Sequence, residues 1–73
     1  MSRVPALKGR DVVRALKRAG FEEHRQKGSH LILKRGELRV TVPIHSKDLK
    51  RGTVQSIIEQ SDLTVDEFLG FLK

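Results

Sequence analysis

Residues 30–45 read HLILKRGELRVTVPIH and hold two apolar, branched runs on either side of the step Gly36-Glu37. Such runs are typical of strands, and a glycine between them can supply the positive φ of a type II′ turn. A two-residue loop at Gly36-Glu37 therefore predicts an antiparallel hairpin. In its register Leu33 faces Val40.

This register sorts the hairpin side chains onto two faces, because successive residues of a strand point in opposite directions. The face predicted to pack against helices holds Leu31, Leu33, Leu38, Val40, Val42 and Ile44. The opposite face, which is polar and cationic, holds His30, Ile32, Lys34, Arg39, Thr41 and His45. His30 lies across from Pro43, so His45 is its diagonal neighbour at about 7–8 Å between backbone positions.

A third strand is expected ahead of the hairpin, from Phe21 to Gln26. This stretch is mostly polar and only weakly strand-like. The alternation of side chains does not determine the length of the loop around Lys27-Gly28. The sequence therefore does not tell which face of the sheet His24 occupies.

A first helix is predicted from Arg10 to Ala19, where Val12, Val13 and Leu16 recur at helical spacing. Gly20 followed by Phe21 indicates that the helix ends in a Schellman motif, with Phe21 making the apolar contact that accompanies it.

Two further helices are predicted after the hairpin. Residues 44–52 form a loop dense in turn formers and positive charge, which leads into a helix from about Thr53 to Gln60. Thr64 and Glu67 have the spacing of a capping box and start a last short helix.

The predicted order is thus α-β-β-β-α-α, an α+β fold with a three-stranded antiparallel sheet and helices packed on one face. This architecture resembles the double-stranded-RNA-binding domain. Residues 1–73 are expected to form a single domain with a core of about residues 9–69.

Composition narrows the class of protein. The chain has 73 residues, 37% apolar and 33% charged, with no cysteine and a net charge of +6. Residues 1–51 carry 14 basic and 5 acidic side chains, against 1 basic and 4 acidic in residues 52–73. A region this basic is typical of nucleic-acid binders, although an acidic protein partner, anionic lipid or solubility alone would also account for it. Since the opening MSRVPALKGR lacks the apolar run of a signal peptide, a cytoplasmic protein is expected.

His30 is the candidate catalytic residue. Histidine both accepts and gives a proton near neutrality, and RNA carries its own nucleophile in the 2′-OH. A base and a cation that steadies the phosphate therefore suffice for cleavage, without metal or cofactor. The competing interpretation is that His30 is a surface residue of the hairpin without a functional role. His45, on the same basic face, is a possible supporting residue.

Other residues have a structural interpretation beside the functional one. Gly28 and Ser29 are turn formers first, and potential backbone and hydroxyl donors to a phosphate second. The candidate RNA- or phosphate-binding cations are Lys27, Lys34, Arg39, Lys47 and Lys50. Exposed strand cations also serve simply to protect edges and keep a protein soluble. No metal-binding motif or nucleotide loop is present, so no metal or cofactor is expected.

An ordered set of short motifs carries a family resemblance. They are Gly20-Phe21, RQKGSH at 25–30, VPIH at 42–45, KRGT at 50–53 and Ser56-Ile57-Ile58. Together they resemble the HicA family of bacterial toxins, which are mRNA interferases, over about residues 9–69. The resemblance implies a double-stranded-RNA-binding-domain-like fold, cleavage of mRNA with the histidine after Gly-Ser, here His30, and control by a HicB-type antitoxin that covers this histidine.

Two rival hypotheses remain beside a metal-independent endoribonuclease toxin. One is a module that binds double-stranded RNA or DNA without cutting it, for which the fold and basic face would suffice. The other is a protein whose basic face meets an acidic protein partner.

Overall fold

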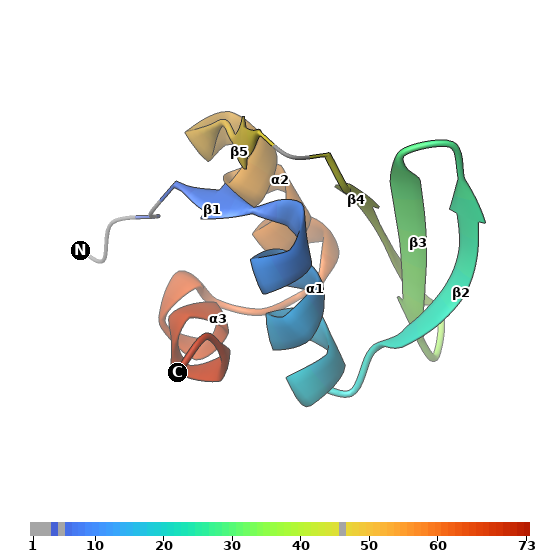
Figure 1. Ribbon diagram of the computed structural model, residues 1–73. Coiled ribbons are helices and arrows are strands. Elements are labelled where there is room, and N and C mark those ends of the chain that lie inside the picture. The colour runs from blue at the N-terminus through green and yellow to red at the C-terminus, as the bar shows by residue number, and fades with distance from the viewer. Residues whose placement is uncertain (1–3, 5, 46) are drawn as a thin grey trace.

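The computed structural model describes residues 4, 6–45 and 47–73. Residue 46 of the predicted loop and residues 1–3 and 5 of the N-terminal stretch lie outside the described residues. In chain order the elements are β1 (Leu7–Lys8), α1 (Gly9–Arg18), β2 (Glu22–Lys27), β3 (His30–Arg35), β4 (Leu38–Pro43), β5 (Asp48–Leu49), α2 (Arg51–Gln60) and α3 (Val65–Phe71). Strands β2, β3 and β4 form one antiparallel sheet, and the helices gather on one side of it (Figure 1). The predicted fold is confirmed.

The β3–β4 hairpin has the predicted register. Leu33 pairs with Val40, and the last pair before the loop is Arg35 with Leu38. Gly36 has φ of 59°, and Asp62 is the single non-glycine residue with positive φ in the described part of the chain. A positive φ at the first loop position alone matches a type II′ turn. The turn therefore fixes which face each strand residue occupies.

Strand β2 extends the sheet beside β3, and the structure settles the loop that the sequence left open. Lys27 pairs with His30, so the connection is the two-residue loop Gly28-Ser29, with φ of 58° at Gly28. The register shifts between Glu23 and Arg25, which leaves His24 at a β-bulge without a pairing partner. All six residues of β2 are exposed, so this edge of the sheet is charged rather than apolar.

The other edge, β4, is partly covered by α2. The backbone N–H of Thr41 points away from β3 and donates to Oε1 of Gln60 at 3.4 Å. Pro43 occupies the next outward position of the same edge, where a missing N–H removes no bond of the ladder.

The core lies between the inner face of the sheet and the helices. Its described members are Val4, Val12, Val13, Ala15, Leu16, Phe21, Leu31, Leu33, Val40, Val42, Leu49, Val54, Ile57, Ile58 and Phe68. Ala19, Leu38 and Ile44, also predicted to face inward, pack against this cluster while half-buried. The predicted apolar face is therefore the buried one.

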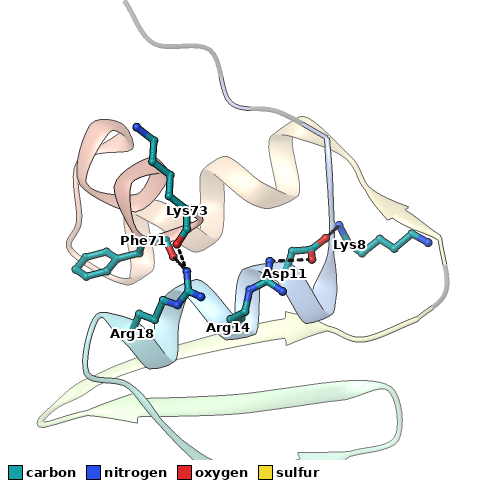
Figure 2. A network of polar contacts seen from close by, with 6 residues as sticks. All are labelled: Lys8, Asp11, Arg14, Arg18, Phe71 and Lys73. Atoms are coloured by element: carbon teal, nitrogen blue, oxygen red, sulfur yellow. Dashed lines mark hydrogen bonds and ion pairs between the residues drawn. The ribbon is translucent and has the colours of Figure 1, made fainter.

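Helix α1 ends as predicted. Gly20 has φ of 100°, its N–H donates to Lys17 O at 3.0 Å, and Phe21 N–H donates to Leu16 O at 2.9 Å. These are the two bonds of a Schellman motif. In Figure 2 the Arg18 side chain reaches from this end of α1 to the carbonyl oxygens of Phe71, at 3.0 Å, and Lys73. This contact ties α3 to α1.

The predicted capping box of α3 is present. Glu67 N–H donates to Thr64 Oγ1 at 3.1 Å, and Thr64 N–H donates to Glu67 Oε1 at 2.8 Å. Two backbone donors that the first turn would leave unpaired are thereby satisfied.

A two-stranded sheet that the sequence did not predict joins the N-terminal stretch to the basic loop. Leu7 of β1 pairs with Leu49 of β5, and Lys8 pairs with Asp48. Directly after β1, Gly9 is buried against the end of β4, where a Cβ would lie 2.2 Å from Pro43 O. Only glycine permits so close an approach, and it brings the start of α1 to the end of β4.

Candidate functional site

His30 stands at the first position of β3, on the face of the sheet that points away from the helices. It is exposed, and its paired neighbours are Lys27 on β2 and Pro43 on β4. Its diagonal neighbour on β2 is Arg25, whose pairing with Ile32 places it on the same face. No carboxylate occupies these positions. A solvent-open imidazole therefore lies among positive side chains.

Two of the predicted phosphate-binding residues lie at the other end of the sheet. Lys34 pairs with Arg39 next to the Gly36-Glu37 loop. Lys34 lies four positions along the strand from His30, a distance of about 13 Å at about 3.3 Å per residue. These two cations share a face with His30 but do not surround it.

Gly28 and Ser29 form the turn between Lys27 and His30, and both are exposed. The carbonyl oxygen of Ser29 accepts a hydrogen bond from Ile44 N–H at 2.6 Å. This bond extends the β3–β4 ladder past the last paired residues. It keeps the segment that carries His45 beside the turn that carries His30.

His45 lines two hollows in the surface. One hollow is lined by Lys8, Arg10, Ile44 and His45, at the junction of β1, α1 and the end of β4. The other is lined by Pro43, His45, Lys47, Asp48, Leu49, Lys50 and Thr53, at the start of α2. Lys47 and Lys50, two of the predicted phosphate-binding cations, therefore lie next to His45 and not next to His30.

The cations of this region are not neutralised by neighbouring carboxylates. The ion pairs within the described residues are Arg14 with Asp11, at 3.5 Å, and Lys17 with Glu23. Asp48 is the one carboxylate that lines either hollow. Unpaired positive charge at a concave surface attracts anions, phosphate groups among them.

Neither a cluster of metal ligands nor a membrane-spanning helix is found in the part of the chain that the structure describes. No group of three or more histidine, aspartate, glutamate or cysteine side chains there lies close enough together to hold a metal ion. No helix there is long and apolar enough to cross a membrane.

The sequence did not place three cations beside the two histidines. Arg25 joins the His30 surface only through the register of β2, which the sequence left open. Lys8 and Arg10 join His45 through the close approach of Gly9 to Pro43, a contact between residues far apart in the chain. Gly9, between Lys8 and Arg10, is the sequence feature that could have pointed to this contact. No neighbouring residue, however, indicates which part of the chain Gly9 packs against.

The fold and site together define a small basic α+β protein that displays a histidine on the open face of an antiparallel sheet. Residues 9–63, about three quarters of the chain, match the family model described as the HicA toxin of bacterial toxin-antitoxin systems. The chain belongs to this HicA toxin family, which implies an antitoxin partner. No curated protein gives a significant match to it.

Proposed function

We propose that this HicA-family protein is an endoribonuclease that cleaves mRNA and is neutralised by a HicB-type antitoxin. The observation that carries this proposal is the exposed His30 on the open sheet face, with Lys27 opposite and Arg25 diagonal to it. The family match supports the toxin class, and the resemblance of the GSH motif to the family pattern supports the role of His30.

The chemistry requires one base, one acid and positive charge. His30 takes the proton from a ribose 2′-OH, and the 2′ oxygen then attacks the adjacent phosphorus. The new O2′–P bond replaces the P–O5′ bond, so the products are a 2′,3′-cyclic phosphate and a 5′-OH once the leaving oxygen receives a proton. His30 or His45 supplies that proton. No redox partner is involved, and one positioned acid or base contributes about 10²–10⁴-fold.

The cations divide into two groups in this scheme. Lys27 and Arg25 steady the charge that develops on the phosphate at His30, because they are its nearest neighbours in the register. Lys34 and Arg39, about 13 Å along the strand, hold a more distant part of the RNA backbone. Gly28 and Ser29 shape the turn that leads to His30, and their backbone N–H and hydroxyl groups are potential donors to the phosphate there.

The antitoxin has to block the open sheet face to silence such a site. An acidic surface that covers His30 and Lys27 would displace RNA and compensate the positive charge at once. A complex that buries α3 while leaving His30 exposed would contradict this geometry.

The test compares two labelled RNAs of the same sequence in the presence of EDTA, one natural and one 2′-deoxy throughout. The proposal predicts fragments that end in a 2′,3′-cyclic phosphate from natural RNA and none from the 2′-deoxy strand. A mobility shift of both strands without fragments would favour the rival, a binding module that does not cut.

A further inference from the structure

The hollow lined by Lys8, Arg10, Ile44 and His45 is a built feature rather than a chance arrangement of surface lysines. Its two walls are the start of α1 and the end of β4, which meet where Gly9 is buried against Pro43 O. Any larger residue at position 9 would push these walls apart.

The backbone on both sides of the hollow is held in place. Lys8 is paired with Asp48 in the β1–β5 sheet, and its N–H donates to Asp11 Oδ2 at 3.3 Å (Figure 2). On the opposite wall, Ile44 N–H donates to Ser29 O at 2.6 Å. The cationic side chains therefore project from fixed positions, which lowers the entropy lost when they bind a ligand.

The hollow is positive and its charges are available. Lys8, Arg10 and His45 line it, and no carboxylate does. Asp11, one turn into α1, is engaged by Lys8 N–H and by the Arg14 side chain. Among the residues that the structure describes, the Arg10 and His45 side chains make no hydrogen bond or ion pair with each other or with any neighbour.

The position of the hollow relates it to His30. His45 follows Ile44, whose N–H donates to the carbonyl oxygen of Ser29, the residue before His30. A phosphate in the hollow and a phosphate at His30 can therefore belong to one strand.

We infer that the Lys8–Arg10–His45 hollow is a phosphate subsite that binds the RNA backbone near the bond that His30 cleaves. The inference rests on the proposed function for the identity of the strand. It adds to that function a second anchoring point, in which Lys8 of β1 and Arg10 of α1 position the substrate and take no part in bond cleavage.

The test measures binding separately from cleavage. The probe is a short, fluorescently labelled 2′-O-methyl RNA, which keeps every phosphate but has no free 2′-OH to react. Anisotropy titrations across a salt series give the slope of log affinity against log salt concentration. For single strands this slope changes by about 0.7 for each phosphate contact.

The variants are Arg10→Gln and Lys8→Gln, with Lys73→Gln as a control that removes the same charge at the far end of the chain. Arg10→Gln is expected to weaken binding severalfold and to reduce the salt slope by about 0.7, while Lys73→Gln leaves both unchanged. With natural RNA, Arg10→Gln is expected to raise KM and leave kcat near the parental value, in contrast to a His30 variant.

The possible outcomes separate the subsite from the cleavage activity. Parental affinity and slope in both Arg10→Gln and Lys8→Gln would overturn the subsite and leave the nuclease intact. If the parent binds RNA but does not cut it, and the variants have a smaller salt dependence of binding, the subsite is upheld and the proposed nuclease activity is overturned. A parent that neither binds the 2′-O-methyl strand nor cuts natural RNA would overturn both.

Discussion

Replacement of Gly9 by alanine tests the contact that joins the start of α1 to the end of β4. The alanine Cβ would lie 2.2 Å from Pro43 O and 3.1 Å from Ile44 Cα, and both neighbours are backbone atoms that no rotamer change can move away. Relief of the overlap requires a backbone shift of about 1 Å, and overpacking of this kind costs about 1–3 kcal/mol.

The expected loss of stability follows from two opposing effects. Alanine in a helix is favoured over glycine by up to about 1 kcal/mol, which offsets part of the clash. We expect a net loss of about 1–2 kcal/mol in the free energy of unfolding. In a domain of this size the melting temperature should fall by about 4–16 °C.

Gly52 provides the matched control, because it occupies the first turn of α2 and has nothing within 4 Å of its would-be Cβ. Gly52→Ala should leave the melting temperature unchanged or raise it, by up to about 1 kcal/mol in stability. Thermal unfolding followed by circular dichroism measures both variants. If Gly9→Ala melts at or above the parental temperature, the close approach of α1 to β4 is not as described.

Three further variants test the packing and capping. Leu33→Ala, at a fully buried position of the central strand, should lower the free energy of unfolding by about 2–5 kcal/mol in a urea titration, and a smaller change would place this side chain outside the core. Thr64→Ala removes the hydroxyl that caps α3 and should cost about 1 kcal/mol by the same assay, whereas no change would mean that the cap contributes nothing. Lys17→Gln breaks an exposed ion pair with Glu23 and should cost less than about 1 kcal/mol, an effect that high salt removes; a larger, salt-resistant loss would contradict the exposure of the pair.

The hairpin was predictable because two independent constraints agree on it. The alternation of apolar residues in β3 and β4 fixes their faces, and Gly36 fixes the turn between them, so a shift by one residue would bury Lys34 and expose Leu33. The exposed position of His30 follows from the same parity. The ends of the α1 and α3 helices were predictable because their capping residues act locally.

The rest of the site depends on contacts between distant segments. Strands β1 and β5 have two residues each, too short for any periodicity to indicate them, and β5 lies within a stretch that the sequence presents as a loop. The bulge at His24 arises from the register of β2, a strand without an apolar face to define it. Of the candidate phosphate-binding cations, Lys34 and Arg39 therefore lie farther along the strand, and Arg25 takes the position nearer to His30.

Cleavage by a His30→Ala variant tests the catalytic assignment most directly. His24→Ala is the matched control, because His24 is also an exposed histidine of the sheet but lies at the bulge, away from the Lys27–His30 pair. In single-turnover assays on labelled RNA, with folding checked by circular dichroism, His30→Ala should cut about 10²–10⁴-fold more slowly than the parent while His24→Ala stays close to it. A folded His30→Ala protein that cuts RNA at the parental rate would show that the imidazole at position 30 does not carry out the reaction.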